Sequence, residues 1–355
     1  MTNNNTIGID LGNRKHSVCA LDADGNVLFR KEVANTPEAL KPFFEENRGA
    51  TVAMETGLCC RWISALSKAC GCDTIVGNAR KLAMIWGDKN KNDKNDAEKI
   101  ARMARADRTL FHPVALRDDA HHQLFQLLEL REGEVKERTR RINSIRGVCK
   151  ANAVFLPDCD AASFGKKAPP AMPAELRKLF RPALDALAAT DRAIRRYDAM
   201  VEDYCRRMFP SETGLLQTVP GVGPVTAAAL VAAIGDPSRF GKARDAGSYF
   251  GLTPGQDQSG DGDAPKRVTK TGNDMVRKLL VNCANRIAQR NARDNALKRH
   301  GEKISARGGK VAKRKARVAV ARKLAVLMLA MLKSGMEYDD GLVSGGNKPA
   351  GESAA

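Results

Sequence analysis

Four carboxylates in the first hundred residues have side-chain types and spacing that suit a hard divalent cation. Asp10 lies in a short β-branched stretch at residues 6–12, and Glu55 lies in a second such stretch at residues 51–57. A carboxylate among apolar strand residues is costly to bury unless something neutralises it, and a bound cation is the usual partner. For Asp10 alone, an exposed position at the end of a strand is the alternative.

Asp93 and Asp96 stand at the start of a run of apolar residues with helical spacing. On a helix they would share one face, where two like charges repel unless a cation lies between them. The alternative is a plain helix N-terminus, where capping and the helix dipole favour Asp. Together with Asp10 and Glu55 they predict a Mg²⁺ site, because such oxygen ligands hold Mg²⁺ and a pair of ions can clamp a phosphodiester under attack.

The elements that must position these acids predict an α/β fold of the ribonuclease-H type over residues 1–117. In that fold the first and fourth strands are neighbours, so Asp10 and Glu55 would emerge together. Gly8 and Gly12, in and just after the first strand, leave room for another backbone or a phosphate to come close. The predicted order is three hairpin strands, a helix, a strand, a helix and a strand, at residues 6–12, 17–21, 27–33, 37–47, 51–57, 61–69 and 73–76.

Residues 118–205 are long, polar and helical in pattern. One helix starts at Asp118, and a second runs from about Ala174 to Met200 after a proline-containing break. Two long amphipathic helices predict an antiparallel hairpin, or a coiled-coil arm for self-association. The alternative is a helical linker that packs on its own domain.

Residues 206–335 predict a mainly helical domain with a helix-hairpin-helix. Gly221 and Gly223 lie in Val-Pro-Gly-Val-Gly between two helical patterns. Such glycines let the turn touch phosphates, and the next helix offers free N–H groups to them. The alternative is a turn that merely joins two helices. Residues 336–355 are small and polar, which predicts a disordered tail.

The C-terminal region also carries most of the chain's excess positive charge. Ser259 lies in a glycine-rich stretch upstream of these cations, and by itself it indicates only a polar loop. Residues 305–317 predict a cationic loop that enters an apolar helix at residues 318–332. The candidate phosphate contacts are Lys266, Arg267, Lys270, Arg277, Lys310, Lys313 and Arg314.

The overall composition favours a polyanionic partner. Lys and Arg number 59 against 41 Asp and Glu, a net charge of +18, so nucleic acid is the first candidate and a membrane surface a weaker one. Aromatic residues make up only 5%, which argues against base stacking on aromatic platforms. No apolar run is long enough to span a bilayer and no secretory leader precedes Asp10, so we expect a cytoplasmic protein. The nine cysteines lack paired zinc spacing, and we expect reduced thiols.

In this order, the motifs resemble the insertion-sequence one-ten family of transposases, the DEDD recombinases related to Piv-type DNA invertases. The resemblance covers nearly the full length. It is carried by Gly-Ile-Asp-Leu-Gly around Asp10, Met-Glu-Thr-Gly around Glu55, Asn-Asp-Lys-Asn-Asp-Ala with Asp93 and Asp96, Val-Pro-Gly-Val-Gly at 219–223, Phe-Gly-Leu-Thr-Pro with Ser-Gly at 250–260, and Ala-Val-Ala-Arg-Lys-Leu-Ala at 319–325.

The resemblance implies a Holliday-junction-resolvase-like N-terminal domain, a helical dimerisation arm and a C-terminal transposase domain. It implies a serine nucleophile, and Ser259 is the matching position. It further implies donor and target DNA as substrates, a structured noncoding bridge RNA that pairs with both, and a homo-oligomer, either a dimer or a tetramer on DNA. Residues 260–263 are more acidic here than the basic segment expected after the serine.

The implied chemistry joins the acids to the serine. Mg²⁺ held by the four carboxylates would activate the Ser259 hydroxyl, whose attack on DNA leaves a 5′-phosphoserine ester that can be rejoined without ATP. The alternative is a metal-dependent Holliday-junction-type endonuclease that uses water, with Ser259 as a turn residue. A third class is a non-catalytic nucleic-acid-binding protein, which would leave the four carboxylates unexplained.

Overall fold

The computed structural model describes residues 4–79, 82, 93–109, 111–255 and 267–341. The chain divides into two compact units, residues 1–116 and residues 117–355, and each is described by itself. No helix within the described ranges is both long and apolar enough to cross a membrane. All nine cysteines are free thiols, in agreement with the expectation from the sequence.

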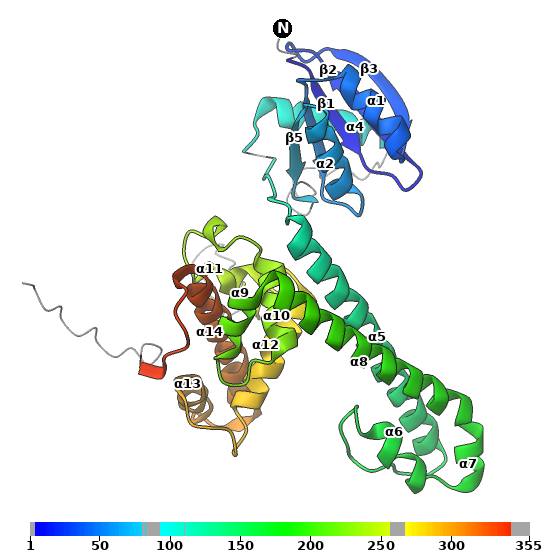
Figure 1. Ribbon diagram of the computed structural model, residues 1–355, viewed down its shortest axis with the longest axis vertical. Helices are drawn as coiled ribbons and strands as arrows, with labels where there is room; N and C mark the ends of the chain where they lie inside the picture. The colour runs from blue at the N-terminus through cyan, green and yellow to red at the C-terminus, as the bar shows by residue number, and fades with distance from the viewer. Residues whose placement is uncertain (1–3, 80–81, 83–92, 110, 256–266, 342–355) are drawn as a thin grey trace, which may run out of the picture. The chain divides into compact units, whose positions relative to one another are not determined.

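The first unit is built on a five-stranded sheet in the order β3-β2-β1-β4-β5 (Figure 1). Neighbouring strands pair antiparallel in the hairpins β1–β2 and β2–β3, and parallel in β1–β4 and β4–β5. The predicted neighbourhood of the first and fourth strands is confirmed. The strands are β1 (Thr6–Asp10), β2 (Lys15–Leu21), β3 (Val27–Ala34), β4 (Thr51–Glu55) and β5 (Asp73–Gly77).

Helices cover both faces of this sheet. Helices α1 (Pro37–Glu46) and α2 (Cys60–Ala69) cover one face, where Ile7 and Ile9 are fully buried. Helix α4 (Asp93–Ala106) covers the other face. Residues that alternate along a strand point to opposite faces. The apolar residues of β1 therefore face α1 and α2, whereas Gly8 faces α4.

In the second unit two long helices, α5 (Asp119–Ala151) and α8 (Arg181–Met208), run side by side (Figure 1). Arg131 pairs with Asp198 at 2.5 Å and Arg138 pairs with Asp191 at 3.4 Å. Partner numbers fall on α8 as they rise on α5, so the helices are antiparallel, as the predicted hairpin requires. A role in self-association stays a prediction.

The second predicted helix is in fact two helices. Helix α7 (Ala174–Leu179) ends at Leu179, Phe180 separates it from α8, and α8 starts with Pro182 in its first turn. Proline is favoured there because its missing N–H needs no partner in a first turn. Short elements close the tip of the arm, namely α6 (Phe164–Lys167) and a 3₁₀ turn (Pro169–Ala171).

Helix α10 (Pro224–Ile234) is buried at every position from Thr226 to Ile234, and α5, α8, α9 (Pro210–Gln217) and α12 (Asp274–Ile287) pack against it. A helix that is apolar all round belongs in the centre of a core. Leu124 of α5 and Val201 of α8 join this core, so the predicted domain boundary at residues 205/206 falls inside α8. The remaining elements are a 3₁₀ turn (Pro237–Arg239), α11 (Asp245–Tyr249), α13 (Ala296–Ser305) and α14 (Gly309–Ser334).

The predicted cationic loop at residues 305–317 is wrong for most of its length. Helix α14 starts at Gly309, so the cations after it lie on helical turns. Ala312, Ala316 and Val320 recur every four residues and are buried, which gives this basic segment an apolar face. Lys and Arg are good helix formers, so the segment needs no loop.

The predicted disordered tail, residues 336–355, is also wrong at its start. The Asp340 carboxylate accepts hydrogen bonds from the Ala296 N–H and the Tyr338 hydroxyl, both at 2.6 Å. Asp340 also pairs with Arg299, and the Tyr338 N–H donates to the Thr218 hydroxyl. These contacts attach the chain up to residue 341, and residues 342–355 lie outside the described residues.

Candidate functional site

Asp10 and Glu55 end two neighbouring parallel strands. Ile9 is paired with Met54, so Asp10 and Glu55 follow at the next position on each strand. On β1, Asp10 lies on the same face of the sheet as Gly8. On β4, Glu55 lies on the same face as Ala53, which packs against α4. Both carboxylates are half-buried and therefore emerge at one end of the sheet, on the face that α4 covers.

Helix α4 brings its first turn toward the same end. A Cβ at Gly8 would overlap the Ala97 carbonyl oxygen and lie 2.5 Å from the Ala101 nitrogen, so this part of α4 crosses β1 at Gly8. Near its last turn, Arg105 donates to the Ala23 carbonyl at 2.8 Å, in the turn between β2 and β3. That turn lies at the opposite end of the sheet from Asp10. Helix α4 therefore runs antiparallel to β1, with its N-terminus on the Asp10 side.

The other two predicted acids start this helix. Asp93 is its first residue, and its side chain lies outside the described residues. Asp96, one turn later, is half-buried and lies 3.6 Å from Lys99. Among the side chains that are described, no three His, Cys, Asp or Glu groups converge to hold a metal ion. All four acids offer hard oxygen ligands, which fits Mg²⁺ in type, and the complete four-carboxylate site stays a prediction.

A buried polar network that was not predicted from the sequence holds the turn that follows Asp10. His16 is fully buried, and its Nδ1 accepts a hydrogen bond from the Gly12 N–H at 3.2 Å. The Asn35 side-chain amide donates to the Asn13 carbonyl at 3.0 Å, and its backbone N–H donates to the Arg14 carbonyl at 2.9 Å. Burial lowers the pKa of His16, which keeps Nδ1 free to accept. Strand alternation could have predicted that His16 is buried, because His16 lies on the same face of its strand as the buried Val18 and Ala20.

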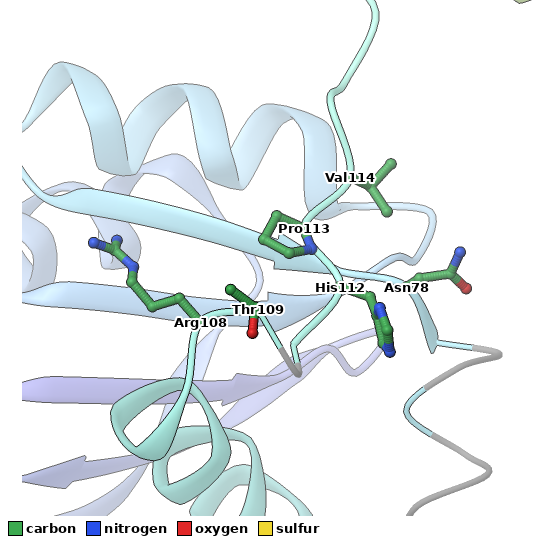
Figure 2. Close-up of a pocket in the computed structure, with 6 residues that line it drawn as sticks. All are labelled: Asn78, Arg108, Thr109, His112, Pro113 and Val114. Carbon is green, nitrogen blue, oxygen red and sulfur yellow. The ribbon is translucent and has the colours of Figure 1, made fainter. Parts of the chain in front are cut away.

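A pocket of about 460 Å³ lies along the β5 edge of the same sheet (Figure 2). Asn78 follows Gly77, which pairs with Glu55, so one end of the pocket adjoins the acidic end of the sheet. Arg108 lies at the opposite end and is paired with Asp73. The lining residues are Asn78, Arg108, Thr109, His112, Pro113 and Val114. The pocket thus offers amide, guanidinium and imidazole donors beside the candidate site.

The glycine-rich turn at residues 218–223 joins α9 to α10, as predicted. Gly221 has a φ of 85°, and a Cβ there would lie 2.9 Å from Ile287. Packing against α12 and a left-handed backbone therefore account for this glycine without a ligand. Gly223 precedes Pro224 at the N-terminus of α10 and has open space around it. Phosphate contact at this turn stays a prediction.

Ser259 and Lys266 lie outside the described residues. On either side of that segment the chain is paired, since the Gly255 N–H donates to the Arg267 carbonyl at 3.1 Å. The chain therefore enters and leaves residues 256–266 at adjacent points. Arg267 and Lys270 are exposed there.

Arg277 differs from the other candidate phosphate contacts. Its side chain is only 13% exposed. Its guanidinium donates to the Phe250 carbonyl at 3.2 Å, the Thr271 carbonyl at 2.8 Å and the Asp274 carboxylate at 2.8 Å. These bonds give Arg277 a structural role, and its contact with nucleic acid stays a prediction. Lys310, Lys313 and Arg314 are exposed on α14.

Two family models match the chain. A DEDD transposase model of the IS110 type, described as "Transposase", matches residues 7–151, which contain the four acids. A model described as "Transposase IS116/IS110/IS902 family" matches residues 213–300, which contain the glycine-rich turn and Ser259. A DEDD transposase domain points to dependence on a divalent metal ion.

Individual transposases are similar over most of their length. The transposase for insertion sequence element IS1111A of Coxiella burnetii is 26% identical over 296 residues, which span 78% of this chain and 76% of that protein. The transposase for insertion sequence element IS1328 of Yersinia enterocolitica is 26% identical over 294 residues, which span 82% of this chain and 86% of that protein. One family model matches residues 7–151, which include the sheet, and the other matches residues 213–300 of the helical unit. The chain therefore belongs to the IS110 family of transposases, enzymes that cut and rejoin DNA.

Proposed function

We propose that this transposase cuts and rejoins donor and target DNA through a covalent serine intermediate, under the guidance of a noncoding bridge RNA. The observation that carries the proposal is the shared position of Asp10 and Glu55 at one end of the sheet. Helix α4 supports it by directing Asp93 and Asp96 toward that end. Four acids from three elements would then face one phosphodiester.

Asp10, Glu55, Asp93 and Asp96 would hold Mg²⁺, which when bound supplies positive charge for the phosphate and the leaving oxygen. Ser259 Oγ attacks the phosphorus, the bond from phosphorus to the 3′ oxygen breaks, and the serine proton ends on that oxygen. The product is a 5′-phosphoserine ester and a free 3′-hydroxyl. Attack by an exchanged 3′-hydroxyl reverses the step and frees the serine, so no ATP is needed.

The exposed cations and the turn near Gly221 and Gly223 would hold nucleic acid. Arg267, Lys270 and the cations in the first turns of α14 are exposed and would contact phosphates. The α5–α8 arm would associate with a second copy, so that the enzyme works as a dimer, or as a tetramer on DNA. The bridge RNA would supply the sequence specificity that phosphate contacts lack.

The test is a denaturing gel of end-labelled donor DNA incubated with protein, RNA and Mg²⁺. The native enzyme should give a covalent protein–DNA adduct, which EDTA and Ser259→Ala should each abolish. Ser248→Ala is the matched control, because Ser248 is exposed and only donates to the Asp245 carbonyl. An adduct that persists in Ser259→Ala would place the nucleophile elsewhere. Cleavage in that variant without any adduct would instead support the junction-type endonuclease.

A further inference from the structure

The direct pairing between β1 and β4 stops one residue before the two acids. The last pair of this ladder is Ile9 with Met54. At the next position Asp10 pairs with a residue of β2, and Glu55 pairs with a residue of β5. Two carboxylates at one end of a sheet repel each other. The separation of Asp10 from Glu55 therefore depends on how the segments that follow the two strands are held together.

The side chain of Asn35, which follows β3, connects these two segments. Its Nδ2 donates to the Asn13 carbonyl at 3.0 Å and to the Cys59 sulfur at 3.3 Å. Its backbone N–H donates to the Arg14 carbonyl at 2.9 Å. Asn13 and Arg14 belong to the turn after β1, and Cys59 belongs to the turn after β4. An asparagine amide has two N–H donors, and here they serve two different turns.

The turns themselves are closely packed. A Cβ at Gly12 would overlap the Lys15 carbonyl oxygen, so the turn after β1 is tight. A Cβ at Gly57 would lie 3.4 Å from Leu11, which places the turn after β4 in van der Waals reach of the turn after β1. The contact between Leu11 and Gly57 is apolar and has no fixed direction, whereas the hydrogen bonds of Asn35 are directional.

We propose that Asn35 is a positioning residue for the carboxylates of Asp10 and Glu55. By fastening the turn after β1 to the turn after β4, it holds two like charges at the separation that one cation can bridge. The inference rests on the proposed function in one respect, that these acids bind Mg²⁺. It adds a residue that organises the site before the ion arrives. Residues behind metal ligands typically contribute about tenfold to a hundredfold to metal affinity.

Asn47 provides a matched control at the other end of the sheet. Its Nδ2 donates to the Phe43 carbonyl at 2.7 Å, at the C-terminus of α1. Its carbonyl accepts from the N–H of Ala50, which directly precedes β4, whereas the acid ends that strand. Asn35 and Asn47 are both half-buried, and alanine at either position removes side-chain hydrogen bonds to the backbone. The loss reaches the acids only from Asn35.

The first experiment measures metal binding to the full chain without nucleic acid. Mn²⁺ is the probe, because carboxylates bind it as they bind Mg²⁺ and its free form gives an electron paramagnetic resonance signal. Asn35→Ala should weaken Mn²⁺ binding by about tenfold. Asn47→Ala should leave the Mn²⁺ affinity unchanged, although both substitutions should lower the melting temperature.

Two failures of this experiment are distinguishable. Equal Mn²⁺ affinity of Asn35→Ala and the native protein, with binding lost in Asp10→Asn, would overturn the role of Asn35 and leave the metal site standing. No Mn²⁺ binding by the native protein, or binding kept in Asp10→Asn, would contradict the proposed function and this inference with it.

The second experiment tests the connection through Cys59. Cys59→Ala removes the sulfur acceptor and should weaken Mn²⁺ binding by part of the Asn35→Ala factor. The double variant should bind no more weakly than Asn35→Ala, because both substitutions break the same contact. Cys60→Ala is the matched control, since this neighbouring thiol is buried in the core under α2 and should affect stability alone. Factors that multiply in the double variant would overturn the proposed connection.

Discussion

In residues 1–116 the candidate acids Asp10 and Glu55 end neighbouring strands of a sheet, whereas in residues 117–341 the candidate cations Lys310, Lys313 and Arg314 occupy exposed positions on helix α14. Asp10 and Glu55 are placed by strand register, because one residue of slip would turn each to the opposite face. Several cations in the first turns of α14 are exposed to solvent. Lys313 and Arg317 line a groove between α12, α13 and α14. The strand register of the sheet therefore fixes where the two acids lie, whereas packing between helices determines which cations of α14 lie beside one another.

The largest expected effect comes from substituting Asp10. Asp10→Asn removes one charge from the proposed metal site and should lower DNA cleavage by on the order of a hundredfold to a thousandfold, since charge stabilisation at a reacting phosphate is a large part of catalysis. The measurement is the cleavage rate with Mg²⁺ on labelled donor DNA. Asp24→Asn, at an exposed position in the turn after β2, should cleave normally. Undiminished cleavage by Asp10→Asn would remove the acids from the reaction.

The next largest effect concerns the contact between β1 and α4. Gly8→Ala places a methyl group against the α4 backbone and should lower the free energy of unfolding by about 1–3 kcal/mol. Cleavage should fall as well, because α4 carries Asp93 and Asp96. Urea unfolding and cleavage rates measure the two effects.

Gly133→Ala is the matched control for Gly8→Ala. Gly133 is exposed in the middle of α5 and has nothing within 4 Å of an added Cβ. This substitution should raise the free energy of unfolding by about 0.5–1 kcal/mol, because alanine loses less conformational freedom in a helix. If both variants behave alike, Gly8 is not the point of close approach.

A smaller effect should appear as a pH dependence of stability. Burial lowers the pKa of His16 in the folded protein below its unfolded value of about 6.5. The unfolded state then binds more protons between the two pKa values, so this contribution is complete above about pH 6.5 and is lost as the pH falls below it. Unfolding free energies at pH 7.5 and pH 5.5 test this.

His16→Asn should flatten the pH dependence over that interval. His300 has a lowered pKa from burial and from nearby Lys323 and Lys303, so it contributes with the same sign. His300→Asn should therefore leave the His16 part of the slope in place. An unchanged slope in His16→Asn would show that burial does not lower the pKa of His16 in the folded protein.

The smallest expected effect distinguishes Lys310 from Arg277, two cations that were both predicted from the sequence to contact phosphates. Lys310→Ala should weaken nucleic-acid binding about twofold to threefold for every sequence and lower the salt slope by about one, as loss of one phosphate contact does. Arg277→Ala should instead lower thermal stability, because its guanidinium bonds two carbonyls and Asp274. A normal melting temperature for Arg277→Ala would return this residue to the set of phosphate contacts.

Local patterns were enough to predict several elements. The order of β1, β2 and β3 follows from strand alternation and the Asp-Gly turn, and the start of α1 follows from Thr36 and Pro37. The pairing of β1 with β4 followed from the order of the elements, which allows few topologies. The strands that carry Asp10 and Glu55, and the fact that these strands are neighbours, could therefore be predicted from the amino-acid sequence.

Other features depend on contacts between residues far apart in sequence. The attached chain near Asp340 depends on Ala296 and Arg299 of α13, and the turn beside the buried His16 depends on Asn35, which follows β3. Helix α14 starts early because Ala312 and Ala316 pack on neighbouring helices. Periodicity in one segment carries no record of which partner will cover its face.

The sequence by itself determined which side chains could do chemistry and on which strands and helices they lie. Only the tertiary structure decided that α4 covers the face on which Asp10 and Glu55 lie, that Arg277 is engaged within the fold, and that two of the α14 cations border a groove between α12, α13 and α14. The reason is physical: side-chain type and local periodicity are properties of a segment, whereas direction, burial and pairing arise only when segments pack against one another.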